Sequence, residues 1–343
     1  MVFSLTIIIT TTTTICTVLL TLPFIITVTS SYSLNITKNQ LQQQQLLTVQ
    51  IIYRHGDRTP YWIYKTDPYQ EDEYPEGEGN LINRGRERMY RYGVMLRQRY
   101  RKYLEDMPTK NVQAYSSPIR RCMETSLAVL AGLFPPHQPW YDSLPLAKLW
   151  LPIAVETVEE ARSWMLNPDA PCARAERIDR QMETSNDKLR NFLQENKQFI
   201  QVIGNLTGEN YDSNHLRWIY VGYLFDTLFT EQIYFGNKWQ RPEWLDRAGP
   251  NAWERLSTFN DMVFSIYETE QEFLKLRAGN FLNTLIENFR IVFKDDQQRP
   301  QQSLRINHNK NRKFFTYGSH DTMEAYILQA LGLYKGNENK KWR

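Results

Sequence analysis

The feature that most constrains this chain is a buried-strand pattern that ends abruptly in a cationic turn. Residues 46–53 are a run of apolar and β-branched side chains, which is typical of a largely buried strand. A glycine and a proline then end that strand and leave Arg54, His55 and Arg58 in the turn that follows. Ligands of open α/β sheets bind at the carboxyl ends of the strands. The sequence therefore predicts an α/β fold with a ligand site at this turn.

The residue types in this turn favour a phosphoryl group as the ligand. Arg54 and Arg58 each present a planar, permanently charged fork that matches phosphoryl oxygens. His55 lies between them, and a neutral imidazole can attack phosphorus and carry the group covalently. The neighbouring guanidinium groups lower the pKa of such a histidine and keep it neutral in mild acid. Gly56 lets the backbone approach the anion closely. The alternative is an exposed basic turn without a ligand.

A similar pattern returns near the end of the chain. Residues 312–317 are predicted to form a strand that ends in Gly318, His320 and Asp321 before the next helix. A carboxylic acid in this position could protonate an oxygen that leaves a phosphoryl group. Three apolar residues mark the buried face of that helix, and a glycine ends it: Met323, Ile327, Leu331 and Gly332.

A third strand end is predicted between these two. Residues 111–115 form a short strand pattern, and the helix that follows runs to about residue 134 with Ser116, Ser117 and Pro118 as start signals. Arg121 is therefore expected at a helix N-terminus, where backbone N–H groups also bind anions. Residues 81–104 predict an earlier helix with a solvated basic face and one buried stripe: Met89, Tyr92, Leu96, Tyr100 and Tyr103.

Taken together, the spacing R-H-G-x-R-x-P at residues 54–60 and the pair His320 and Asp321 resemble the signatures of the histidine acid phosphatases, a branch of the histidine phosphatase superfamily. The resemblance implies a phosphoglycerate-mutase-like three-layer α/β core with a mostly helical inserted cap domain. It implies hydrolysis of small phosphate monoesters at acid pH through a phosphohistidine, without a cofactor or a metal. It also implies a role for six residues: His55 as nucleophile, Asp321 as general acid, and Arg54, Arg58, Arg121 and His320 as phosphate ligands.

The sequence departs from the family pattern in two places. In the family, two serines or Ser-Thr precede D-x-D-R. Here Ser116, Ser117 and Arg121 match this pattern, whereas Pro118 and Arg120 replace the two acids. The chain also ends 22 residues after Asp321, where family members usually continue, which suggests a fragment or a shortened member. With Asp57, the first turn resembles that of the prostatic and lysosomal acid phosphatases more than that of the phytases. Phytases share both motifs and are the alternative enzyme, and a catalytically weak secreted binding or antigenic protein is the alternative class.

The first 37 residues contain no charged side chain, and residues 3–28 are a threonine-rich apolar run. A cleaved secretory signal peptide is favoured over an uncleaved membrane anchor formed by residues 3–28. The predicted division is a signal peptide at 1–33, a first core segment at 34–136, a helical cap insertion at 137–290 and a second core segment at 291–343.

Export is also indicated by two N-glycosylation patterns, which begin at Asn35 and Asn205. The expected location is extracellular, with a lysosomal or membrane-anchored protein as the alternative. In an oxidising compartment Cys122 and Cys172 either pair with each other or remain free.

The composition argues against other classes of partner. The formal net charge of +3 is too small to require nucleic acid. The five histidines are scattered and form no cluster with metal-ligand spacing, so a metal site is not expected. No stable membrane partner is expected unless the leader is retained. A homodimer is known in similar proteins, but no residue pattern in this chain indicates an interface.

Overall fold

The computed structural model describes residues 4–10, 16–21, 25–27, 46–105, 107–136, 149–209, 211, 218–292 and 312–334. By compactness the chain divides into two units, of which the first comprises Met1–His55, Arg86–Ala170 and Gly279–Glu324. The second comprises Gly56–Gly85, Pro171–Ala278 and Ala325–Arg343. Each unit is built from segments that are distant in sequence. The domain boundaries predicted from the sequence stay a prediction.

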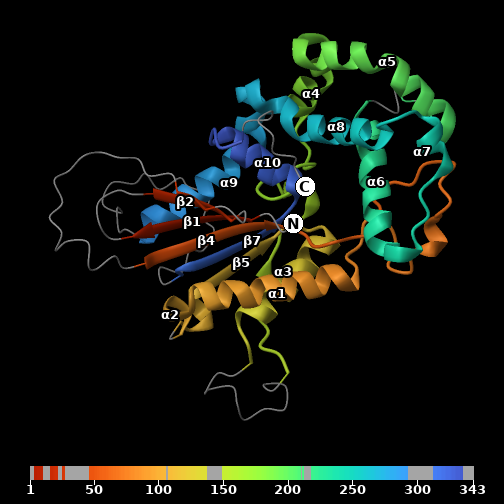
Figure 1. Ribbon diagram of the computed structural model, residues 1–343. Coiled ribbons are helices and arrows are strands. Elements are labelled where there is room, and N and C mark those ends of the chain that lie inside the picture. Colours follow the sequence, from red (N-terminus) through yellow and green to blue (C-terminus); the bar gives the residue numbers. More distant parts are fainter. Residues whose placement is uncertain are drawn as a thin grey trace. The chain divides into compact units, whose positions relative to one another are not determined.

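The first unit contains one mixed sheet with the strand order β3-β2-β1-β4-β7-β5-β6 (Figure 1). The strands are β1 (Ser4–Thr10), β2 (Cys16–Thr21), β3 (Ile25–Thr27), β4 (Leu46–Arg54), β5 (Val112–Ser116), β6 (Val155–Glu156) and β7 (Phe314–Ser319). From β4 to β6 all neighbours are parallel, so their carboxyl ends lie at the same edge. The last of these strands in sequence, β7, lies between β4 and β5. The three predicted strands are confirmed, and their three polar turns therefore emerge together.

The N-terminal strands extend this sheet on its β4 side. β1 pairs antiparallel with β4, and β2 and β3 follow it in the same antiparallel sense. These are the segments predicted to form a leader, and cleavage of that leader stays a prediction. Within the described part of the chain, no helix combines the length and the apolar character needed to cross a membrane.

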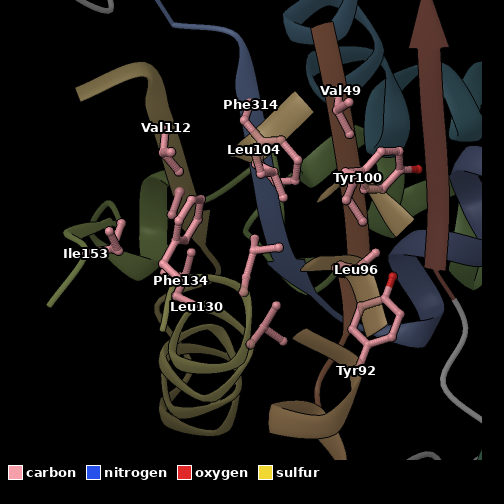
Figure 2. Packing of buried hydrophobic residues seen from close by; sticks show 14 of the residues in the cluster. Val49, Tyr92, Leu96, Tyr100, Leu104, Val112, Leu130, Phe134, Ile153 and Phe314 are labelled. Atoms are coloured by element: carbon pink, nitrogen blue, oxygen red, sulfur yellow. The ribbon is translucent and has the colours of Figure 1, made fainter. Parts of the chain in front are cut away.

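One face of the sheet is covered by α1 (Asn83–Arg99), α2 (Arg101–Leu104) and α3 (Arg120–Leu133). Figure 2 shows strand residues such as Val49 and Phe314 pointing toward Leu96 and Tyr100 of the helical segment. The predicted stripe is buried at Met89, Tyr92, Leu96 and Tyr100, whereas Tyr103 is only partly buried. The helices α1 and α3 approach closely at two glycines, and a Cβ atom at Gly93 would lie 2.1 Å from the carbonyl oxygen of Val129.

The other face is held by a buried polar network. Because side chains alternate along a strand, Gln50 points away from Val49 and Ile51. Its amide donates to the carbonyl oxygen of Leu285 in α9 (Gln271–Val292) at 3.1 Å. The side-chain oxygen of Gln50 accepts hydrogen bonds from Asn288 and Tyr317, both at 2.9 Å. Helices thus lie on both faces of a mixed sheet, which confirms the predicted three-layer α/β fold.

The remaining helices belong mostly to the second unit. They are α4 (Ala173–Ser185), α5 (Asp187–Thr207), α6 (Ile219–Phe235), α7 (Glu243–Arg247) and α8 (Ala252–Ser265), and α10 (Asp321–Ala330) begins in the first unit. The helical sequence pattern at 251–292 forms two helices, α8 and α9, which are separated by a 3₁₀ turn at Ile266–Thr269. The reason is tertiary: the ring of Tyr267 stacks on Phe273 and its hydroxyl bonds to Asp179.

The end of α10 differs from the prediction at one residue. Gly332 has a positive φ of 67° and ends the helical segment as expected. Leu331, predicted on the buried face, is 38% exposed. The helix has already ended at Ala330, so the helical periodicity no longer applies to the next side chain.

Candidate active site

Two histidines emerge from neighbouring strand ends in the first unit. Arg54 pairs with Ser319 at the last position of the parallel strands β4 and β7. The backbone N–H of His55 then donates to the carbonyl oxygen of Ser319 at 3.1 Å, which extends the ladder by one residue. As a result the rings of His55 and His320 lie with their centroids 5.7 Å apart and their planes at 75°. Both side chains are almost fully buried.

A glycine in β7 makes room for this arrangement. A Cβ atom at Gly318 would lie 2.1 Å from the hydroxyl oxygen of Ser126 in α3. The next side chain, Ser319, is buried and donates to the carbonyl oxygen of Leu166 at 2.6 Å. Strand β7 is therefore held close to α3 and to the loop at residue 166, which fixes the direction in which His320 leaves the sheet.

An ion pair borders the histidines. The guanidinium group of Arg54, at the end of β4, lies 3.2 Å from the carboxylate of Asp321 at the start of α10. Both side chains remain partly open to solvent, at 26% and 20% exposure. The Asp321 carboxylate also accepts from the backbone N–H of Thr322 at 2.9 Å. A cationic group and an acid are thus held together next to the pair of histidines.

Glu324 is a residue that the sequence reasoning missed. It is buried one helical turn after Asp321, and its carboxyl group accepts a hydrogen bond from the backbone N–H of Arg54. Burial raises the pKa of Glu324 well above its usual range, while the nearby charge of Arg54 opposes this effect. Its spacing of three residues from Asp321 on a helix was the available signal.

Arg121 contacts the second histidine. It lies in the first turn of α3, as predicted, with its Nη2 atom 3.3 Å from Nδ1 of His320. The other ring nitrogen, Nε2, lies 2.9 Å from the hydroxyl oxygen of Ser117. The structure therefore brings together five of the six predicted residues within the first unit: Arg54, His55, Arg121, His320 and Asp321.

The two serines before α3 do not cap the helix, contrary to the prediction. The residue before the first turn of α3 is Ile119, and no side chain caps the helix there. Ser117 instead contacts His320, and the hydroxyl of Ser116 donates to the carbonyl oxygen of Ser117 at 2.8 Å. A buried imidazole competes for the same hydroxyl, and sequence spacing does not reveal such a distant partner.

The sixth predicted residue, Arg58, belongs to the second unit. Its Nη2 atom lies 2.9 Å from the carboxylate of Asp226 in α6, a partner that the sequence did not indicate. Its role as a phosphate ligand stays a prediction. Gly56 in the same turn has a structural reason to be glycine, since a Cβ atom there would lie 2.7 Å from the carbonyl oxygen of Gly85.

The remaining predicted sites have separate outcomes. Asn35 lies outside the described residues. Asn205 is exposed on α5, whereas the hydroxyl of Thr207 in the same pattern is buried and donates to the carbonyl oxygen of Ile203. Cys122 and Cys172 are both free thiols. Among the residues that the structure describes, no group of three or more His, Cys, Asp or Glu side chains is arranged to hold a metal ion.

Comparison with known families is consistent with this geometry. The family model of the histidine phosphatase superfamily (branch 2) matches residues 45–343, and the chain belongs to this family. Among curated relatives, lysosomal acid phosphatase from Bos taurus is 32% identical over 306 residues, covering 87% of this chain and 65% of the relative. Prostatic acid phosphatase from Mus musculus is 29% identical and covers 86% of this chain and 72% of the relative. The chain thus spans about two thirds of the length of such relatives.

Solved structures support the fold. The apo form of Hafnia alvei phytase matches with a TM-score of 0.56 and 16% identity, covering 82% of this chain and 74% of the phytase chain. The same phytase in complex with tartrate gives a TM-score of 0.57 at 17% identity, covering 84% and 75%. At this identity the likeness establishes the shared fold only.

Proposed function

We propose that this protein is a histidine acid phosphatase that hydrolyses small phosphate monoesters through a phosphohistidine intermediate. The observation that carries the proposal is the buried pair His55 and His320, bordered by Arg54, Arg121 and Asp321 at aligned strand ends. Cationic forks and neutral imidazoles at one edge of a parallel sheet are suited to a phosphoryl group. The named relatives support the same class of reaction.

In the proposed reaction, a ring nitrogen of His55 attacks phosphorus while the bond to the leaving oxygen breaks. Asp321 in its protonated form gives its proton to that oxygen, so an alcohol departs. Water then attacks the phosphohistidine, gives a proton back to Asp321 and releases phosphate. The guanidinium groups of Arg54 and Arg121 stabilise the negative charge of the transferring group throughout.

The ion pair between Arg54 and Asp321 connects substrate binding with this proton transfer. Without substrate, the carboxylate accepts from the guanidinium group at 3.2 Å. A phosphate that takes up the donors of Arg54 leaves Asp321 beside an anion, which favours its protonated form. Because the acid must carry its proton when the leaving group departs, activity is expected to be highest at acid pH.

The proposal includes the location of the protein. The curated relatives are named as lysosomal and prostatic acid phosphatases, which supports an acidic or extracellular compartment. A signal peptide within residues 1–33 and glycans at Asn35 and Asn205 would agree with that location. Small phosphomonoesters are the expected binding partners.

The test is hydrolysis of p-nitrophenyl phosphate by the purified chain from about pH 3 to pH 8, in the presence of EDTA, with His55→Ala as the inactive control. We expect an acid optimum, resistance to EDTA and a trapped phosphohistidine that is absent from the variant. A folded chain without any activity would contradict the proposal and favour a binding protein with this fold. A strong preference for inositol hexakisphosphate would instead favour a phytase.

A further inference from the structure

We infer that Ser117 is a positioning residue that fixes the proton of His320 on Nε2 and leaves Nδ1 facing Arg121, so that phosphate binding is coupled to proton uptake at Nδ1. The inference rests on the proposed function for its consequence, since it concerns the proposed phosphate ligand His320. Its structural basis is independent of any reaction.

The position of the proton follows from the donors and acceptors around the ring. A guanidinium group has N–H donors and no acceptor. Its contact at 3.3 Å with Nδ1 of His320 therefore requires a lone pair on that nitrogen. In a neutral imidazole the proton then resides on Nε2, which donates to the hydroxyl oxygen of Ser117 at 2.9 Å. Ser117 is fully buried, so water does not compete for this hydrogen bond.

Cys122 packs against the same side of the His320 ring as Ser117. Its sulfur atom lies 3.5 Å from Nε2 of His320, and the thiol donates to the carbonyl oxygen of Ser319 at 3.2 Å. Burial raises the pKa of the Cys122 thiol to about 12, despite the nearby charge of Arg121. The thiol therefore keeps its proton and adds no negative charge that would pull a second proton toward Nε2.

The charged groups around His320 determine when Nδ1 takes up a proton. Arg121 contacts Nδ1 directly, and the ring of His55 packs edge-to-face against that of His320. The ion pair of Arg54 with Asp321 borders the two rings. A proton on Nδ1 would be repelled by Arg121 in the empty site. A bound phosphate accepts hydrogen bonds from Arg121 and from a protonated Nδ1. Protonation of Nδ1, by solvent or by the phosphate monoanion, therefore becomes favourable only when the anion is present.

This arrangement assigns separate tasks to the two ring nitrogens. Nε2 is anchored to buried protein atoms and Nδ1 is available to the anion. Loss of the Ser117 hydroxyl removes the acceptor of Nε2–H. This destabilises the doubly protonated ring that binds phosphate, and it also lets the ring of the empty site adopt the other tautomer. Phosphate affinity should fall, whereas the attack by His55 should change little.

The experiment compares Ser117→Ala with Ser117→Thr, which restores a hydroxyl group, and with Ser116→Ala, which removes a neighbouring buried hydroxyl that donates to the backbone carbonyl of Ser117. Ring nitrogen chemical shifts of His320, assigned with a His320→Gln variant, report the tautomer directly. Titration with inorganic phosphate reports affinity as a function of pH. Steady-state kinetics with p-nitrophenyl phosphate separate KM from kcat.

We expect wild type to carry the proton on Nε2 and to take up about one proton per phosphate dianion bound. Ser117→Ala should show mixed tautomers and bind phosphate about tenfold more weakly, with KM raised to a similar extent and kcat within about threefold. Ser117→Thr should recover most of the affinity, and Ser116→Ala should resemble wild type.

A wild-type ring protonated on Nδ1, or unchanged phosphate affinity in folded Ser117→Ala, would overturn the inference. The wild-type tautomer needs no variant, so poor folding of Ser117→Ala leaves the test intact. If wild type hydrolyses no phosphate ester, the proposed function fails, while the tautomer and the phosphate titration still decide the role of Ser117.

Discussion

Each compact unit contains a buried polar cluster, and the two clusters satisfy their charges in opposite ways. In the first unit, the guanidinium group of Arg121, which can only donate, contacts His320, so the cluster presents cationic donors. In the second unit, two acids are buried together: Asp67 in the loop after the first motif and Glu231 in α6. Their carboxyl groups are close enough to shift each other's pKa, and Oδ2 of Asp67 and Oε1 of Glu231 have no other hydrogen-bond partner among the described residues.

A retained proton allows the two acids to be buried side by side. The indole N–H of Trp239 donates to Glu231 at 3.2 Å, and the backbone N–H of Tyr69 donates to Asp67 at 2.9 Å. Burial raises the pKa of both carboxyl groups, and the charge of Asp67 raises that of Glu231 further. Glu231 therefore keeps its proton, and we expect the two carboxyl groups to share it. Burial also raises the pKa of the neighbouring Tyr64 and Tyr74, which stay neutral.

The comparison shows two solutions to the cost of burying polar groups. Groups of the same sign, such as two carboxyls, become compatible when a proton is retained between them. A cluster of cationic donors is completed by an anionic ligand. The first solution belongs to a structural contact between the loop and α6, and the second to the proposed phosphate site. Under the proposed function, acid pH favours both clusters, because each of them then holds a proton.

The largest effect is expected from Asp321→Asn, which tests whether the first cluster supplies a proton. Under the proposed function, kcat for an alkyl phosphate should fall by about 10²- to 10⁴-fold, because a poor leaving group needs the acid. The loss with p-nitrophenyl phosphate should be much smaller, because that leaving group departs as a stable anion. Steady-state kinetics with both substrates measure the difference. Equal losses would assign Asp321 to charge balance with Arg54 alone.

The matched control for this comparison is Asp246→Asn. Asp246 is an exposed acid that also pairs with an arginine, Arg241, at 3.1 Å. Removing its charge should leave both substrates unaffected, since exposed ion pairs contribute little to stability.

The next effect concerns the scaffold of the first cluster. Gly93→Ala places a methyl group 2.1 Å from a backbone oxygen in α3, so α1 and α3 must separate. We expect a loss of about 2–3 kcal/mol in the free energy of unfolding, measured by urea denaturation. Glu87→Ala at an exposed position of the same helix should change it by less than about 0.5 kcal/mol. Equal stability of both variants would show that the helices tolerate a wider separation.

The strand ends of the first cluster could be predicted from the sequence, whereas most of its contacts could not. The apolar run before Arg54, the glycine before His320 and the arginine in the first turn of α3 are local patterns, which sequence alone displays. The contact of Ser117 with His320 depends on β7 lying between β4 and β5, a nonlocal pairing.

The acidic pair of the second unit was not predicted at all. Asp67 lies in a polar loop and Glu231 within a mostly apolar helix, so each residue considered alone is an ordinary surface acid. Only the folded chain buries both and makes them neighbours. Local pattern thus identified the groups proposed to contact a ligand, whereas the groups that satisfy one another across long sequence distances required the structure.

The smallest effect is a change in the pH dependence of stability in Glu231→Gln. The pKa of Glu231 in the folded chain lies above its value of about 4.3 in the unfolded chain. The pair therefore contributes fully to the free energy of unfolding below the unfolded pKa, and this contribution is lost as the pH rises toward the folded pKa. Glutamine keeps a donor without titrating. Between about pH 5 and pH 8, wild type should therefore lose about 1–2 kcal/mol more stability than the variant, measured by urea unfolding with tryptophan fluorescence. Glu254→Gln, an exposed acid on α8, should keep the wild-type slope. If Glu231→Gln also keeps that slope, the two carboxyls do not share a proton, and the contrast between the clusters is lost.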